Sequence, residues 1–320
     1  MRRAPVALGG TATVVAALVC LPLVYLVVRA AEGGADAWDI LLRDRTWELV
    51  GRTVLLVAAV TAATVAVGVP LAWLVTRTDL PGRRVWAVAA ALPLVIPSYV
   101  VALALLSAFG FDGLLADLDI GGFGGSLVAL TLATYPYVFL LTAAALRQLD
   151  TSLEDASRAL GRSRRYTFMR VTLPVIRPSV AAGALLVALY TISDFGVVSL
   201  MRYDTLTRAI FQQYRTSFDR TPAAVLGLLL VALTIVVLLL EARARGRVRL
   251  ASAGSRGSQG APPVQLGRWR WPALGATLGV IVAALVVPVS VLVHWAGRGV
   301  DGETVDAVWR AAGNSLLGSG

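Results

Sequence analysis

Residues 222–240 read PAAVLGLLLVALTIVVLLL, a stretch without a single charged side chain. An α-helix rises about 1.5 Å per residue, so a run of roughly 20 apolar residues crosses the hydrocarbon core of a bilayer. A membrane β-strand would alternate apolar and polar residues, because its two faces meet lipid and lumen. The stretch lacks that alternation and predicts a membrane-spanning helix.

Comparable apolar runs recur along the whole chain. Hydrophobic residues make up 57% of the sequence and charged residues 15%, whereas a soluble domain carries about a quarter charged residues. The runs predict an all-α fold, a polytopic transmembrane helical bundle with about seven spans. The predicted spans are 7–28, 50–76, 85–109, 124–146, 178–200, 222–240 and 272–295.

The distribution of charge predicts how the bundle is oriented. The first run follows Arg2 and Arg3 and has two interpretations, a signal peptide or a retained anchor. We favour the anchor, because Arg29 stands where a cleavage site needs small residues. With the N-terminus in the cytoplasm, 19 of the 29 arginines but five of the 19 acidic residues lie on the cytoplasmic side. Cytoplasmic loops of membrane proteins carry such an excess of positive charge.

Residue types that are scarce or missing exclude several functions. The sequence contains no lysine, so it has no Gly-Lys-Ser/Thr phosphate-binding loop and cannot be an ATPase itself. Cys20 is the only cysteine and His294 the only histidine, which excludes an internal disulfide and a cysteine metal site. We therefore expect no enzymatic activity, no cofactor and no firm metal site. The net charge of +10 is explained by the membrane rather than by nucleic acid.

Two features predict the division of the chain. Residues 251–267 are rich in Ser, Gly, Pro and Gln and are typical of a linker. Residues 47–55 (WELVGRTVL) have an echo in residues 309–317 (WRAAGNSLL), which suggests that a second copy of the first part begins near residue 272. We expect the chain to be truncated within that copy. The predicted parts are a first permease half at 1–241, a cytoplasmic linker at 242–271 and an incomplete second half at 272–320.

The sequence of the loop between the fourth and fifth spans predicts its local structure. Residues 150–178 read DTSLEDASRALGRSRRYTFMRVTLPVIRP. Thr151 and Glu154 form a capping box that starts a helix, Gly161 can end it in a left-handed turn, and Ser163 can cap a second short helix. Pro174 and Pro178 are expected where the chain re-enters the membrane. Several apolar side chains lie between these signals, and they need something to pack on.

The same loop resembles a motif of a known family. Permeases of ABC importers carry a cytoplasmic Glu-Ala-Ala sequence, then a glycine, then an aliphatic residue and Leu-Pro at fixed spacing. The matching residues are Glu154, Asp155, Ala156, Gly161, Val171, Leu173 and Pro174. Together with Ala159 and Leu160, which the resemblance places in a docking face, we refer to them as the docking motif. Asp155 departs from the motif, where alanine is usual. The resemblance implies that the first short helix docks on a cytoplasmic ATPase, with Leu153 in the docking face; the alternative is an amphipathic helix on the membrane surface.

Further segments are similar to one branch of that family, the permeases for ferric iron, related to those for thiamine. They are residues 70–74 (PLAWL), 76–83 (TRTDLPGR), 92–99 (LPLVIPSY), 135–137 (YPY) and 190–196 (YTISDFG). The resemblance implies the type I ABC importer permease fold and a place in a bacterial cytoplasmic membrane. It implies as partners two copies of an ATP-binding subunit, a periplasmic or lipid-anchored solute-binding protein, a second permease half and lipid.

Polar residues within the predicted spans are candidates for a translocation path. Asp194 lies inside the predicted fifth span, where a carboxylate costs roughly 2.5–3.5 kcal/mol to insert, so it should face a water-filled path or a partner. Oxygen donors suit a hard cation such as ferric iron. The candidates are Ser98, Tyr99, Tyr135, Tyr137, Tyr190 and Asp194. The alternative is that Asp194 pairs with Arg202 near the outer interface. Pro93, Pro97 and Pro136 are expected to break or kink their helices.

The predicted function is an ATP-driven, binding-protein-dependent importer permease, for ferric iron by resemblance. Thiamine or another small polar solute remains an alternative substrate. A further alternative is that the chain is a non-functional fragment of a fused permease. An ion-gradient transporter is a third reading, but it needs coupling carboxylates at mid-membrane, where only Asp194 stands, and it leaves the loop at 150–178 unexplained.

Overall fold

The computed structural model describes residues 6–110, 120–149, 152–217, 219–244, 263–299, 311 and 313–314. Within these ranges the secondary structure is helical, apart from a parallel bridge between Thr78 and Val264, so the all-α prediction is confirmed. The elements are α1 (Val6–Glu32), α2 (Gly34–Leu42), α3 (Asp44–Arg77), α4 (Arg83–Ala89), η1 (Leu92–Val95), α5 (Ser98–Phe109), α6 (Gly122–Gln148), α7 (Ser152–Ala159), α8 (Arg164–Thr167), η2 (Phe168–Thr172), α9 (Leu173–Ser193), α10 (Gly196–Leu200), α11 (Leu206–Thr216), α12 (Thr221–Ala244), η3 (Gly267–Trp269), α13 (Arg270–Ile281), η4 (Val282–Val286) and α14 (Val287–Gly299).

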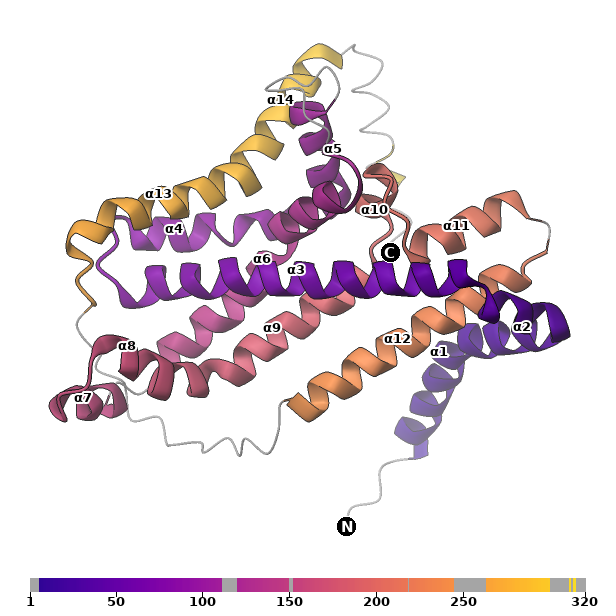
Figure 1. The fold of residues 1–320 in the computed structure, drawn as a ribbon, viewed down its shortest axis with the longest axis horizontal. Helices are drawn as coiled ribbons and strands as arrows, with labels where there is room; N and C mark the ends of the chain where they lie inside the picture. The colour runs from indigo at the N-terminus through magenta and orange to yellow at the C-terminus, as the bar shows by residue number, and fades with distance from the viewer. Residues whose placement is uncertain are drawn as a thin grey trace.

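Six helices among the described residues are long and apolar enough to cross a membrane, and a seventh crossing results if one bent pair counts as a span. This agrees with the expectation of about seven. The six are Thr13–Glu32, Asp44–Arg77, Gly122–Gln148, Phe168–Ser193, Thr221–Arg243 and Gly267–Arg298. The longest, α3, runs from the end where α2 lies to the end where α7 and α8 lie (Figure 1).

Two predicted spans need correction. The stretch at 85–109 is not one straight helix, because it bends by 97° between Arg83–Val95 and Ser98–Phe109. Pro97 stands at the break, where it lacks the amide donor that a continuous helix needs. The fifth span is displaced from 178–200 to 168–193. Pro178 lies inside its helix, and Pro136 likewise stays within the unbroken α6.

The core forms where α3, α6 and α9 pack together. Buried side chains such as Leu56, Val60, Val138 and Val187 join these helices in one cluster. A Cβ atom on Gly183 of α9 would lie 2.7 Å from the Cα atom of Val138 on α6, so only glycine allows this close approach. Small residues at helix contacts serve the same purpose in membrane proteins generally.

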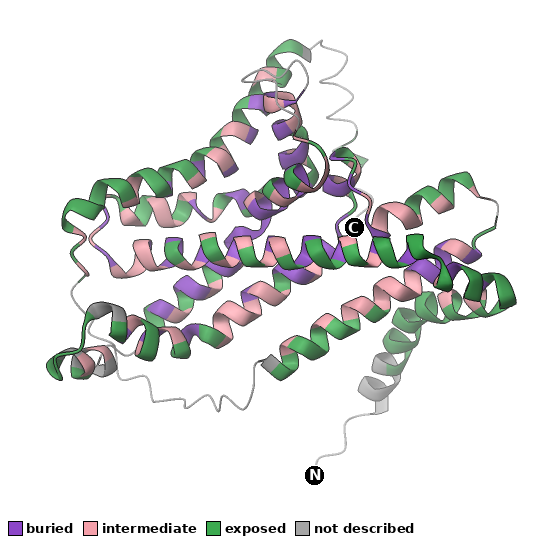
Figure 2. Ribbon diagram, in the orientation of Figure 1, coloured by how far each residue is buried: buried purple, intermediate pink, exposed green. Residues whose placement is uncertain are grey.

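The outer helices cover this core unevenly. α1 packs on α12 and α2, and none of its most apolar window is buried, whereas 61% of the corresponding window of α6 is buried. Figure 2 shows the contrast between the exposed α1 and the interior helices. The helix α13–η4–α14 lies against α5 through Val287 and Val291. A bilayer would cover such exposed apolar faces.

Candidate functional site: the loop at the end of α3 and α9

The described part of the loop, residues 152–178, folds as a helical hairpin that leads into a membrane helix. α7 ends at Ala159, and Gly161 follows with a φ of +75°, the left-handed conformation predicted for it. The amide of Tyr166 donates to Ser163 Oγ at 3.3 Å, as expected of a residue that caps α8. The hydroxyls of Ser157 and Thr167 lie 2.9 Å apart and tie the two short helices together.

The hairpin presents apolar side chains to its surroundings. Leu160 is 81% exposed, and Tyr166 and Met169 are also exposed. Ala156 and Ala159 are exposed on α7. The side chains of Leu153 and Asp155 lie outside the described part. The guanidinium of Arg162 covers one face of the Tyr166 ring at 4.9 Å. This end of the protein therefore offers a small apolar surface with a basic rim, at the opposite end from α2 (Figure 1).

Glu154 turns away from that surface. Its Oε1 accepts a hydrogen bond of 2.6 Å from Thr172 Oγ1, and its Oε2 lies 3.9 Å from Nη1 of Arg77. The side chains of Glu154 and Arg77 are each 13% exposed. Thr151, the other member of the predicted capping box, lies outside the described residues. Arg77 and Thr172 are partners that the sequence analysis missed, because no local pattern links residues so far apart in the chain.

The Leu-Pro end of the docking motif continues without a break into the membrane helix. Residues Phe168–Thr172 form one π-helical turn, and Pro174 stands in the first turn of α9. Val171 is partly buried, and Leu173 packs against the core that Tyr135 and Phe139 share. The hairpin therefore joins α9 without an intervening loop.

Asp194 follows the last residue of α9, so its predicted place inside the fifth span is wrong. Its side chain is 8% exposed. Oδ2 accepts a hydrogen bond of 2.8 Å from Ser98 Oγ, and Oδ1 accepts one of 2.9 Å from the amide of Val197. Ser98 begins α5 and Val197 lies in the first turn of α10, and helix N-termini stabilise negative charge. Arg202 is exposed and forms no ion pair with Asp194.

Two pairs of the predicted path residues are brought together, Ser98 with Asp194 and Tyr137 with Tyr190. The rings of Tyr137 and Tyr190 lie 6.1 Å apart, while Tyr99 is exposed and its Cβ lies close to Gly196. Tyr135 is fully buried, and its hydroxyl has no hydrogen-bond partner among the described residues. Among those residues, no three His, Cys, Asp or Glu side chains stand together as a metal ion would need.

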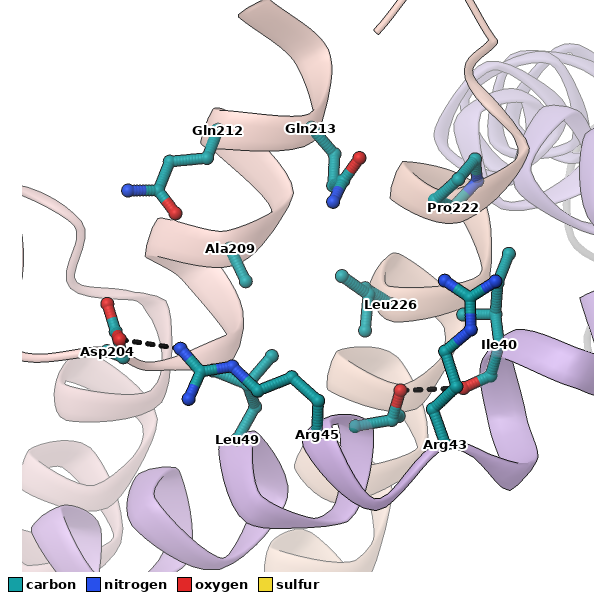
Figure 3. A pocket seen from close by; sticks show the side chains of 11 residues that line it. Ile40, Arg43, Arg45, Leu49, Asp204, Ala209, Gln212, Gln213, Pro222 and Leu226 are labelled. Atoms are coloured by element: carbon teal, nitrogen blue, oxygen red, sulfur yellow. Dashed lines mark hydrogen bonds and ion pairs between the residues drawn. The ribbon is translucent and has the colours of Figure 1, made fainter. Parts of the chain in front are cut away.

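A polar cavity of about 190 Å³ lies at the opposite end of α3. Arg45 Nη2 donates to Asp204 Oδ2 at 2.7 Å, and Thr46 Oγ1 donates to the carbonyl of Ile40 at 2.6 Å. Gln212 and Gln213 of α11 form the facing wall (Figure 3). Asp204 also pairs with Arg208 and lies 3.9 Å from Arg52. This end therefore carries a charged network with more arginines than carboxylates.

Comparisons with known proteins agree with these features. Residues 65–250 match the family described as "Binding-protein-dependent transport system inner membrane component". The Fe(3+)-transport system permease protein FbpB 2 of Haemophilus influenzae is 33% identical over 86% of this chain and 53% of its own length. The chain thus spans about half of that relative. The sulfate transport system permease protein CysT of Salmonella typhimurium is 26% identical over 72% of this chain and 88% of its own.

A solved structure is similar in fold. A chain of the MetNI methionine ABC transporter in an inward-facing conformation superposes with a TM-score of 0.52 at 18% identity, over 64% of this chain and 98% of that one. The predicted resemblance to the ferric iron branch agrees with the similarity to FbpB 2. The chain belongs to the family of binding-protein-dependent transport system inner membrane components, which are the permeases of ABC importers.

Proposed function

We propose that this chain carries ferric iron across a bacterial cytoplasmic membrane, driven by a separate ATP-binding subunit that docks on residues 152–178. The exposed hairpin of α7 and α8 is the observation that carries the proposal. It presents Leu160 and Met169 outward on a segment that leads straight into α9. An apolar surface of this kind on a loop outside the bilayer is suited to a protein partner.

The proposed orientation places this hairpin, and the N-terminus, in the cytoplasm. Three segments predicted to be cytoplasmic meet at this end of the bundle, since Arg77 lies 3.9 Å from Glu154 and Thr78 pairs with Val264. Their arginine content supports the assignment. The opposite end, with the cavity beside Asp204, then faces outward and receives a solute-binding protein. The transporter would contain two ATP-binding subunits and a second permease half, and would work by alternating access.

Iron is the proposed substrate because FbpB 2 is the relative with the higher identity and coverage of this chain. The similarity to CysT supports sulfate as a second candidate. The two ions have opposite charge, so one uptake experiment separates them. Radioactive ferric iron and radioactive sulfate are offered to cells with and without the gene. Loss of sulfate uptake alone would contradict the iron assignment.

Docking is tested by photo-crosslinking in native membranes. A photoreactive amino acid replaces Leu160 in one variant and Leu42, which is 74% exposed at the other end of α3, in the control. We expect the first variant to trap a protein whose peptides contain a P-loop, and the second to trap none. A P-loop protein trapped equally from both positions, or from neither, would contradict the docking assignment.

A further inference from the structure

Arg77 lies where the end of α3, the hairpin and the start of α9 come together. It is the last residue of α3, and its side chain lies beside Glu154 at 3.9 Å. Glu154 is held from its other side by Thr172 at 2.6 Å. The carboxylate therefore lies between the end of a membrane helix and the start of another, since α9 begins one residue after Thr172.

Among the described residues, Glu154 is the acidic partner of Arg77. The Nε and Nη2 atoms of Arg77 are buried and have no hydrogen-bond partner among the described residues. Asp79, the nearest acidic residue in sequence, already accepts the amide of Leu266 at 2.9 Å. A buried guanidinium without a counter-charge is strongly unfavourable. Attraction between Arg77 and Glu154 thus favours one position of α7 relative to α3.

The same turn also holds the residues that lead into the membrane helix Gly267–Arg298. The amide of Val264 donates to the carbonyl of Arg77 at 2.8 Å, and the amide of Asp79 donates to the carbonyl of Val264 at 3.2 Å. Leu266 directly precedes the helix Gly267–Arg298. Residues 77–79, which we call the junction turn, therefore contact both the hairpin and the residues that lead into this helix.

We propose that Arg77 is a positioning residue that fixes the hairpin to the junction turn, so that a push on α7 moves α3 and the Gly267–Arg298 helix together. The proposal rests on the proposed docking function of the hairpin. The edge-to-face contact of Trp73 with Phe168, at 6.1 Å, keeps the two segments close one turn earlier. The carboxylate of Glu154 adds a directional contact, because one oxygen accepts the hydrogen bond from Thr172 while the other faces the guanidinium of Arg77 at 3.9 Å.

The test measures the mobility of the hairpin in the whole chain, purified into lipid nanodiscs. Cys20 is replaced by serine, which leaves no other thiol, and a spin label is placed at Leu160→Cys or, as control, at Leu42→Cys. We expect Arg77→Gln to abolish the immobilised component of the spectrum at position 160 and to leave position 42 unchanged. Arg77→Lys should keep part of it.

Charge reversal separates a positioning role from general damage. Arg77→Glu and Glu154→Arg should each free the hairpin, and the double variant should restore the immobilised component. Glu154→Gln keeps an acceptor for Thr172 but loses the charge, so it should resemble Arg77→Gln. An unchanged spectrum at position 160 in Arg77→Gln, an equal change at position 42, or a double variant no better than the single ones would overturn the proposal.

The outcome is distinguishable from a failure of docking. The spectra need no ATP-binding subunit, whereas crosslinking from position 160 to a P-loop protein does. If the crosslink is absent but the spectra behave as expected, the proposed partner is wrong and the Arg77–Glu154 link stands. If the crosslink forms and is unaffected by Arg77→Gln, while the spectra are also unaffected, the positioning role is wrong and docking stands.

Discussion

At each end of α9 a hydroxyl donates a hydrogen bond to a carboxylate, but the other partner of the carboxylate differs between the two ends. At the first end, Thr172 donates to Glu154, whose remaining partner is the guanidinium of Arg77. At the second end, Ser98 donates to Asp194, whose other carboxylate oxygen accepts from the backbone amide of Val197. Asp194 is satisfied by neutral donors at helix starts. Glu154 has a cationic partner, so we expect the first end to respond more strongly to a change of charge than the second.

The largest expected effect is at Glu154. Glu154→Ala leaves the buried guanidinium of Arg77 unpaired, which should lower the free energy of unfolding by about 3 kcal/mol. The measurement is thermal unfolding of the purified chain in detergent. The double variant Arg77→Met/Glu154→Ala serves as control, and it should recover part of the loss because no uncompensated charge remains. A melting temperature of Glu154→Ala equal to that of the wild type would contradict the comparison.

Asp194→Ala should have a smaller effect, about 2 kcal/mol, because it removes a helix cap and leaves Ser98 without its acceptor. Asp194→Asn keeps an acceptor for Val197 and should be close to wild type in both stability and uptake. If Asp194→Asn keeps its stability but loses uptake, the charge of Asp194 acts in transport, and the path role predicted from the sequence takes precedence.

Gly161 gives a test confined to the hairpin. Gly161→Val forces a β-branched residue into a φ of +75°, at a cost of roughly 1–2 kcal/mol, and should weaken crosslinking from position 160. Gly161→Asn is the control, since asparagine tolerates this conformation. Equal crosslinking in both variants would show that the shape of the turn does not matter for docking.

The smallest effects are expected from the two hydroxyls. Thr172→Val and Ser98→Ala each remove one hydrogen bond to a carboxylate that keeps another partner, at about 1 kcal/mol each. The stabilities of the two variants should respond differently to salt. Screening weakens the ion pair between Glu154 and Arg77 more than the hydrogen bond from the Val197 amide to Asp194. Thermal unfolding of both variants at low and high ionic strength measures the difference, and an identical salt dependence would contradict it.

The sequence predicted the parts of this fold that depend on local physics. Apolar runs located most of the membrane helices, and the glycine at 161 and the serine at 163 were correctly interpreted as turn and cap. The predicted helix boundaries are wrong where tertiary contacts determine them. The chain leaves α9 before Asp194 because the carboxylate is held by Ser98 and Val197. Proline alone could not reveal whether 85–109 kinks gently or turns through 97°.

The sequence likewise predicts only part of the candidate site. The motif from Glu154 to Pro174 could be identified from spacing, but the partners of Glu154 could not, because Arg77 and Thr172 approach it from different helices. Arg77 resembled an ordinary positive residue at the end of an apolar run. Its side chain is 13% exposed and lies beside Glu154 of α7, a tertiary contact that no local pattern predicts. The docking role of the hairpin and the path role of the tyrosines stay predictions.

The bridge between Thr78 and Val264 also bears on the order in which the protein is made. The hydrogen bond from Leu266 to Asp79 joins residues 187 positions apart, so one partner leaves the ribosome long before the other. Contacts of such separation form late, after local ones have closed shorter loops. α3, α6 and α9 can therefore assemble during synthesis before the helix that follows Leu266 joins them, and the turn at residues 77–79 is already formed when that helix arrives.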